Sequence, residues 1–265
     1  MPQPDHAAPP AGSAIWPYPL WIAHRGAGTL APENTLAAFR LGAAHGYRMF
    51  ECDAKLSADG VPFLLHDATL ERTTNAQGDA RQLSWSELSR LDAGGWHSPG
   101  YAGEPPATLA ALVAFCRANG HCLNVEIKPS PGAEAETGTA VARALARQWE
   151  DAEFPPPLLS SFSREALAAA RDAAPRLPRG LLLHELDPDW ADAARHLDCR
   201  AIVCHHPLWT ADLVAQVHAA GWRALAYTVN DADEAQRLLG LGLDGLITDR
   251  VDRLPTGQPG RSGRH

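Results

Sequence analysis

The sequence has few cysteines, and none of them form a recognisable pair. The 265-residue chain contains five, an odd number without a CxxC motif: Cys52, Cys116, Cys122, Cys199 and Cys204. A disulfide framework and a zinc site built on cysteine are therefore not expected. Scattered thiols of this kind are typical of a reduced, cytoplasmic protein.

Long apolar runs and an excess of positive charge are also missing. No apolar run approaches the roughly 20 residues of a membrane-spanning helix, and the N-terminal stretch lacks the apolar core of a secretory signal. We therefore expect no membrane insertion. Lys and Arg number 23 against 31 Asp and Glu, a net charge of -8, which argues against nucleic acid as a partner. Basic residues that bind an anionic substrate must then be local.

The order of apolar and polar segments predicts one large domain. A Pro-rich stretch over 1–19 is expected to be a flexible leader, and the Gly/Pro/Arg/Ser-rich stretch 255–265 a disordered tail. Between them, 20–254 alternates strands and helices. The predicted strands are 20–23, 49–53, 122–127, 157–162, 180–184, 201–204, 223–229 and 245–248; the predicted helices are 34–45, 108–118, 134–149, 163–173, 188–196, 210–220 and 231–239.

Eight strands, seven of them followed by helices, fit a closed (β/α)8 TIM barrel. An open doubly wound sheet would need a GxGxxG loop after the first strand, and HRGAGTLAPEN lacks that spacing. Residues 69–106 interrupt the alternation, and we interpret them as a small insertion after the hairpin of the second strand. Within it, Ser84 and Glu87 form a capping box that predicts a short helix over 84–92.

The stretch 49–67, MFECDAKLSADGVPFLLHD, is a predicted hairpin that brings two carboxylates and an imidazole together. Glu51 and Asp53 leave the strand on the same face, and a loop centred on Ala58-Asp59, of two or four residues, would put Glu51 opposite His66. Two carboxylates on one face repel each other by about 1 to 4 kcal/mol. A raised pKa, a basic neighbour or a divalent cation would relieve this repulsion.

In a TIM barrel the carboxyl ends of the strands carry the chemistry, and polar residues stand at nearly all of these ends here. Glu51, Asp53 and Glu126 form an oxygen-rich set suited to Mg²⁺ or Ca²⁺. His24 and His66 suit a general base and a general acid near neutral pH. Arg25 and Lys128 add positive charge beside the carboxylates. This combination predicts cleavage of a phosphodiester.

Five segments resemble the signature blocks of the glycerophosphodiester phosphodiesterases, in family order. They are HRGAGTLAPENT (24–35), FECDAKLSADGVPFLLHD (50–67), NVEIK (124–128), YTVN (227–230) and DGLITDR (244–250). The resemblance, to the cytosolic bacterial branch, implies hydrolysis of small-molecule substrates such as glycerophosphocholine or glycerophosphoethanolamine to sn-glycerol 3-phosphate and an alcohol.

The same resemblance implies roles for individual residues. Glu51, Asp53 and Glu126 would hold one divalent cation, Mg²⁺ or Ca²⁺ with Mn²⁺ as a further option, and His24 and His66 would be the acid–base pair. We interpret Phe162 and Tyr227 as apolar walls for the glycerol. Tyr227 stands where the family usually has Trp, which puts the substrate preference in question more than the chemistry.

Several alternatives stay open at this point. A related phosphodiesterase could act on lysophospholipid or sphingolipid substrates, and a catalytically silent barrel could serve in binding. Glu33 either caps the first helix or orients Arg25. His184, His205 and His206 match no block and are expected at the mouth or on the surface, and Trp96 is expected to pack the insertion.

Overall fold

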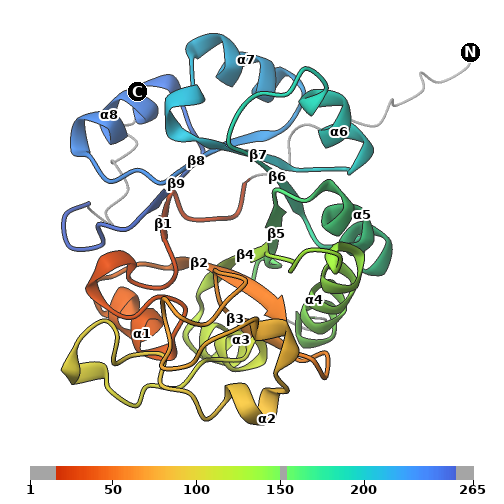
Figure 1. The fold of residues 1–265 in the computed structure, drawn as a ribbon. Coiled ribbons are helices and arrows are strands. Elements are labelled where there is room, and N and C mark those ends of the chain that lie inside the picture. The colour runs from red at the N-terminus through yellow and green to blue at the C-terminus, as the bar shows by residue number, and fades with distance from the viewer. Residues whose placement is uncertain (1–15, 150–153, 255–265) are drawn as a thin grey trace, which may run out of the picture.

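The computed structural model describes residues 16–149 and 154–254, and in it eight parallel strands close into a barrel (Figure 1). The first and last strands, β1 and β9, pair with each other, and β1 also pairs with β2, which closes the ring. This arrangement confirms the predicted (β/α)8 fold. The barrel strands are β1 (Trp21–Ala23), β2 (Met49–Leu56), β4 (Cys122–Ile127), β5 (Leu158–Ser161), β6 (Arg179–Leu183), β7 (Ala201–His205), β8 (Arg223–Tyr227) and β9 (Gly245–Thr248).

Helices surround the strands as an outer layer (Figure 1). They are α1 (Leu36–Ala44), α3 (Leu109–Asn119), α4 (Glu134–Trp149), α5 (Arg164–Ala173), α6 (Trp190–His196), α7 (Ala211–Ala219) and α8 (Ala232–Leu241), and each matches its predicted counterpart to within a turn. Five begin where a side chain accepts a hydrogen bond from the first turn, at Thr35, Thr108, Ser163, Thr210 and Asp231. The helices of the described residues are all too short or too polar to span a bilayer.

Two apolar clusters hold the barrel together. The larger lies between the strands and the surrounding helices. The smaller fills the barrel interior with side chains such as Ile22, Met49, Leu158 and Leu225, and Tyr18 packs with them. Every second side chain of a strand points into the barrel. These inward side chains are apolar in the packed interior and polar at the carboxyl ends of the strands, where the chemistry of a TIM barrel lies.

The hairpin after β2 differs from prediction in its register. The antiparallel strand β3 (Pro62–Leu64) pairs Leu64 with Ala54 and Pro62 with Leu56. The loop is therefore centred on Asp59 alone and has an odd number of residues, so the predicted position of Glu51 opposite His66 was wrong. The cause lies in the turn, where the amide of Ser57 donates to the carbonyl of Val61.

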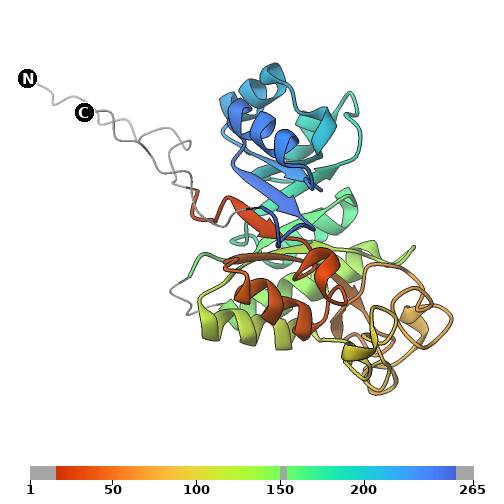
Figure 2. The ribbon, with the colours of Figure 1, turned by 90° about the vertical axis from the view of Figure 1, so that its left-hand side faces the viewer.

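The segment between β3 and α3 corresponds to the predicted insertion at 69–106. It contains the short helix α2 (Trp85–Leu88) and the 3-10 turns η2 (Ala80–Gln82) and η3 (Pro99–Tyr101). It lies on the side of the barrel toward which β1 and β9 point (Figure 2). The capping box of α2 is present, since Glu87 accepts from the Ser84 amide at 2.8 Å.

The helix α2 ends sooner than predicted, at Leu88 instead of Asp92. The Asp92 carboxylate accepts hydrogen bonds from the amides of Gly94 and Gly95, and this local side-chain bonding favours a turn over a further helical turn. The expected tail, 255–265, and most of the expected leader, 1–15, lie outside the described residues.

Candidate active site

A cavity of about 300 Å³ opens at the carboxyl ends of the strands. This volume lies at the small end of the range for ligand pockets, roughly 300–1,000 Å³. The predicted site residues that line it are His24, Arg25, Glu51, His66, Glu126, Lys128, Phe162 and Tyr227. The remaining one, Asp53, lies beneath the cavity surface and is 1% exposed. The site thus brings together side chains from the ends of five barrel strands and from the end of the hairpin strand β3.

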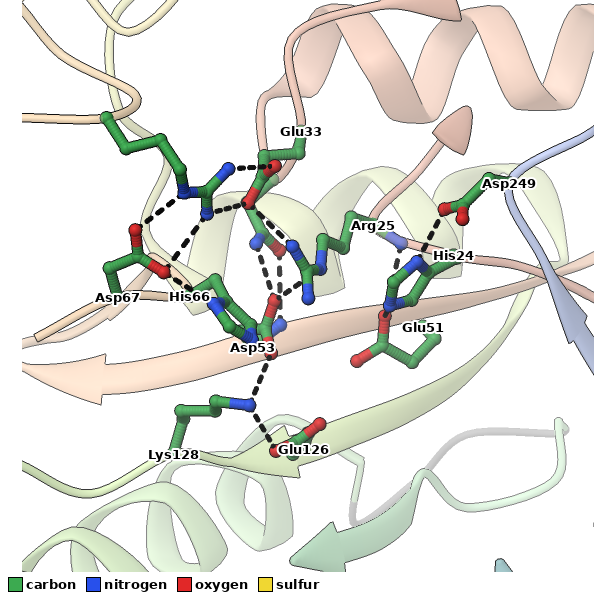
Figure 3. A network of polar contacts seen from close by, with 12 residues as sticks. His24, Arg25, Glu33, Glu51, Asp53, His66, Asp67, Glu126, Lys128 and Asp249 are labelled. Atoms are coloured by element: carbon green, nitrogen blue, oxygen red, sulfur yellow. Dashed lines mark hydrogen bonds and ion pairs between the residues drawn. The ribbon is translucent and has the colours of Figure 1, made fainter. Parts of the chain in front are cut away.

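The three carboxylates predicted to hold a cation form one cluster (Figure 3). Asp53 on β2 and Glu126 on β4 are direct neighbours in the parallel register, and Glu51 lies two residues earlier on β2. One oxygen from each of the three carboxylates lies within 4.8 Å of the others. The register of two adjacent strands therefore builds the cluster.

The cluster fits a divalent cation. Among the described residues, Glu51 Oε1 and Asp53 Oδ1 are buried and have no hydrogen-bond partner. A buried carboxylate oxygen without a partner is costly, and oxygen donors of this kind are what Mg²⁺ and Ca²⁺ bind. The three side chains could therefore hold such an ion.

The charges of the cluster are unequally stabilised. Burial and the nearby charge of Asp53 raise the pKa of Glu51 to about 8, and the same two causes raise the pKa of Glu126. Burial acts to raise the pKa of Asp53 as well, but Arg25 and Lys128 outweigh it and lower this pKa. The protein alone therefore stabilises one full negative charge here more readily than three.

His24 is held by an aspartate that follows the last strand of the barrel, the neighbour of β1. Its Nδ1 lies 2.6 Å from Oδ1 of Asp249, directly after β9, and Asn230 donates to the other oxygen of Asp249 at 2.9 Å. Burial acts to lower the pKa of His24, but the bond to Asp249 and the charge of Glu51 raise it above its usual value. Sequence reasoning did not assign Asp249 a role; its position at a strand end was the available signal.

His66 is held in the same way by its neighbour in sequence. Its Nδ1 lies 2.6 Å from Oδ1 of Asp67, and burial lowers its pKa. A carboxylate only accepts hydrogen bonds, so Nδ1 carries the proton in both histidines. Each pair, His24–Asp249 and His66–Asp67, thereby leaves Nε2 of the histidine to exchange a proton.

Arg25 lies between the carboxylate cluster and Glu33. Its Nε is 3.1 Å from Oδ2 of Asp53, and its Nη1 donates to Oε1 of Glu33 at 2.9 Å. Thr35, not Glu33, caps α1. The structure therefore answers the open question about Glu33: it orients Arg25.

Both lysines of the chain belong to this region. Lys128 Nζ donates to Oε1 of Glu126 at 2.8 Å and lies 3.8 Å from Oδ1 of Asp53. The buried Lys55 donates to the backbone carbonyl of Lys128 at 3.0 Å, so it supports the segment that carries Lys128. Sequence reasoning gave Lys55 no role, because a single lysine in a strand carries no distinguishing pattern.

Asn34 is a further residue whose role sequence reasoning missed. Its amide nitrogen donates to Oδ2 of Asp53 at 2.8 Å, and its amide oxygen accepts from the backbone amide of Asp53 at 3.1 Å. The APENT motif thus supplies a residue that fixes a carboxylate of the cluster.

An aromatic wall faces the charged groups. The rings of Phe162 and Tyr227 meet edge to face at 5.8 Å, and the Tyr227 hydroxyl donates to the carbonyl of Leu183. Phe162 is 43% exposed, and Lys128 Nζ lies 5.6 Å from the centre of its ring. The cavity therefore has one charged side and one apolar side.

The residues without an assignment lie at the rim or beyond it. His184 lines the cavity and stacks on His205 at 4.7 Å between ring centres, while His206 bonds Glu234. The indole nitrogen of Trp96 donates to the Ala93 carbonyl within the insertion.

Arg25 and Lys128 can stabilise the negative charge of a phosphate ester, and the two histidines beside them can move protons to and from its oxygens. This TIM barrel is therefore of the class of enzymes that act on phosphate esters. The chain belongs to the glycerophosphoryl diester phosphodiesterase family, whose model matches residues 24–253. It is an enzyme of the glycerophosphodiester phosphodiesterase class, as the sequence resemblance implied. The family hydrolyses glycerophosphodiesters.

Relatives of this chain agree in sequence and in structure. The glycerophosphodiester phosphodiesterase of Caldanaerobacter subterraneus is 31% identical over 243 residues, covering 89% of this chain and 96% of the relative. A phosphodiesterase of Oleispira antarctica, solved with the product sn-glycerol-3-phosphate, is 35% identical with a TM-score of 0.81, covering 88% and 93% of the two chains. The Agrobacterium tumefaciens glycerophosphodiester phosphodiesterase is 28% identical with a TM-score of 0.75, covering 88% and 97%.

Proposed function

We propose that this chain hydrolyses glycerophosphodiesters, such as glycerophosphocholine or glycerophosphoethanolamine, to sn-glycerol 3-phosphate and an alcohol. The observation that carries the proposal is the buried carboxylate cluster with two unpartnered oxygens, set in one cavity with two aspartate-bound histidines. The Oleispira antarctica relative, solved with sn-glycerol-3-phosphate, supports the same product here.

Glu51, Asp53 and Glu126 would hold one divalent cation, Mg²⁺ or Ca²⁺ with Mn²⁺ as a further option. Such an ion, when bound, supplies positive charge that stabilises the phosphoryl oxygens. Arg25 and Lys128 add fixed charge to the same region, because each already lies within 4 Å of a cluster carboxylate. The cation requirement explains why three acidic side chains are buried together.

The two histidines move the protons of the reaction. One accepts a proton at Nε2 from the attacking oxygen, and the other donates a proton from Nε2 to the oxygen of the departing alcohol. Asp249 and Asp67 fix the ring orientations so that Nε2 faces the reacting atoms, and they keep a proton on Nδ1 of each histidine. Overall, one water is added to the phosphodiester, and the proton that one histidine accepts balances the proton that the other donates.

Phe162 and Tyr227 form the wall against which the glycerol carbons would pack. Both rings line the cavity, and an apolar surface suits the carbon side of a glycerol unit while its phosphate faces Arg25 and Lys128. The wall would bind the ground state and the transition state alike, so it would set affinity more than rate.

The test is release of sn-glycerol 3-phosphate from glycerophosphocholine by purified, metal-stripped protein. Mg²⁺, Ca²⁺ and Mn²⁺ are added back separately, beside a Glu51→Ala variant. Activity restored by a cation in the wild type and absent in the variant supports the proposal. Inactivity toward several glycerophosphodiesters contradicts it and turns the assay first to lysophospholipid and sphingolipid substrates and then to a silent barrel with a binding role.

We also propose that residues 20–254 form a single phosphodiesterase domain with 69–106 as its insertion, and that the protein is cytoplasmic. The absence of paired cysteines in the sequence supports the location, and cell fractionation with an antibody against the chain tests it.

A further inference from the structure

Arg72, in the segment between β3 and α3, binds two carboxylates at once. Toward Asp67, its Nε donates at 2.6 Å and its Nη2 at 3.1 Å. Toward Glu33, its Nη1 donates at 2.7 Å and its Nη2 at 2.8 Å. All three nitrogens of the guanidinium are therefore used in two forked pairs, a geometry that an ammonium group cannot reproduce.

The two carboxylates bound by Arg72 each hold a residue of the active site. Asp67 accepts from Nδ1 of His66 at 2.6 Å. Glu33 accepts from Nη1 of Arg25 at 2.9 Å. One side chain of the insertion thus binds both the carboxylate that holds the proposed proton-transfer residue and the carboxylate that holds the proposed phosphate-binding residue.

Stability alone does not account for this arrangement. The Arg72 side chain is 44% exposed, and exposed ion pairs contribute only about 0–1 kcal/mol to folding. Its charge does hold together two carboxylates that would otherwise repel each other, because Glu33 and Asp67 both contact the same Nη2. Without Arg72, both are expected to move apart and to release His66 and Arg25 from their present orientations.

We propose that Arg72 is a positioning residue that couples the orientation of His66 to that of Arg25. This inference rests on the proposed function, in which His66 moves a proton and Arg25 binds the phosphate. The insertion then contributes to catalysis through a contact that its sequence gave no means of predicting.

Steady-state kinetics on glycerophosphocholine, with Arg72→Ala and Arg72→Lys in the full chain, tests the proposal. The matched control is Arg81→Ala, an exposed arginine of the insertion that pairs with Glu136 on α4, away from the cavity. We expect both Arg72 variants to lose about 10–100-fold in kcat/KM, the usual effect of removing a group that orients an active-site residue. Most of the loss should fall on kcat, and the control should match the wild type.

Chemical rescue separates positioning from folding. Millimolar guanidinium ion should restore part of the kcat of Arg72→Ala, since it replaces the missing fork, and should not change Arg81→Ala. The melting temperatures of the two alanine variants should be similar. Wild-type kcat in either Arg72 variant, or a loss in Arg72→Ala that guanidinium does not relieve, would overturn the proposal.

A second readout is independent of turnover. In metal-free protein, the ring nitrogen shifts of His66, assigned with a His66→Asn variant, report whether Nδ1 still carries the proton. We expect Arg72→Ala to change these shifts and Arg81→Ala to leave them unchanged. If the wild type hydrolyses no glycerophosphodiester, the proposed function fails while this measurement still decides on Arg72, and unchanged shifts in Arg72→Ala would refute its positioning role.

Discussion

Nδ1 of His24 lies 2.6 Å from Oδ1 of Asp249, although 225 positions separate them in the chain. The contact exists because β1 pairs with β9, with Ala23 opposite Thr248. The residues that directly follow these two positions are His24 and Asp249. Closure of the barrel and orientation of the histidine are therefore consequences of the same strand pairing.

Replacement of Asp249 by Asn should lower the pKa of His24. Burial acts to lower this pKa and the bond to Asp249 counteracts it, so removing the negative charge leaves burial less opposed. We expect the His24 pKa, measured by NMR titration of metal-free protein, to fall, and kcat to fall about 10–100-fold. Asp244→Asn is the control, because Asp244 pairs with His218 away from the cavity. An unchanged His24 pKa in Asp249→Asn would contradict the argument.

Replacement of Glu51 by Gln should stabilise the metal-free protein at pH 8. The folded pKa of Glu51, about 8, exceeds its ordinary value of 4.5. The folded state therefore retains a proton that the unfolded chain has released, and stability falls as the pH rises through that interval. Glutamine carries no titrating charge, so the variant should melt at a higher temperature than metal-free wild type at pH 8.

The same variant should respond less to cations. Binding to the folded state alone raises the melting temperature, and Glu51→Gln removes one of the three carboxylates that we propose as cation ligands. Thermal unfolding with and without Mg²⁺ or Ca²⁺ measures both effects. Glu136→Gln on the exposed face of α4 serves as the control and should keep the wild-type cation response. A full cation response in Glu51→Gln would exclude Glu51 as a ligand.

The two histidines should differ in how their loss depends on the leaving group. A nitrophenolate leaves without protonation, so the histidine that protonates the departing oxygen is dispensable for a nitrophenyl phosphodiester. Of His24→Ala and His66→Ala, we expect one to lose about 100-fold or more on glycerophosphocholine but far less on the nitrophenyl ester. The other should lose activity on both. Equal losses on both substrates would argue against separate acid and base roles.

Removal of the Phe162 ring should weaken substrate binding more than turnover. The ring is exposed toward the cavity and meets Tyr227 at 5.8 Å, so Phe162→Ala should raise KM with a smaller change in kcat. Leu186→Ala removes another exposed apolar side chain that does not line the cavity, and it should leave KM unchanged. An unchanged KM in Phe162→Ala would remove the glycerol wall from the proposal.

The sequence predicted those features that depend on local pattern and on strand order. The alternation of apolar strands and capped helices identified the barrel, and the carboxyl-end rule then assembled His24, Glu51 and Glu126 from three strands. Such residues need no knowledge of side-chain geometry, because a barrel brings all its strand ends to one face.

The sequence did not predict what depends on turn geometry or on side-chain reach. One additional residue in the loop around Asp59 changed the hairpin register, since the side-chain period of a strand is two. Arg72 meets Glu33 only because a long side chain spans from the insertion to the loop before α1. Neither relation leaves a periodic signal in the sequence.

Two helical glycines should respond in opposite ways to replacement by Ala. Gly138 lies on α4, where an added Cβ would come within 2.2 Å of the Ala166 carbonyl oxygen on α5. Gly240 lies on α8, and among the described residues nothing beyond the adjacent backbone of its own helix lies within 4 Å of its added Cβ. Alanine favours a helix over glycine by about 1 kcal/mol, so Gly240→Ala should be stabilising by about 0.5–1 kcal/mol.

At Gly138 the backbone contact should outweigh that gain. Overpacking against a backbone atom typically costs about 1–3 kcal/mol, so denaturant unfolding should show Gly138→Ala to be less stable than wild type. Neither glycine lines the cavity, and kcat should stay unchanged in both variants at a temperature where both are folded. Equal stabilisation by the two substitutions would show that α4 and α5 are not in the close backbone contact described above. A loss of kcat in folded Gly138→Ala would instead connect the packing of α4 on α5 to the carboxylate cluster, through Glu126 on the strand that precedes α4.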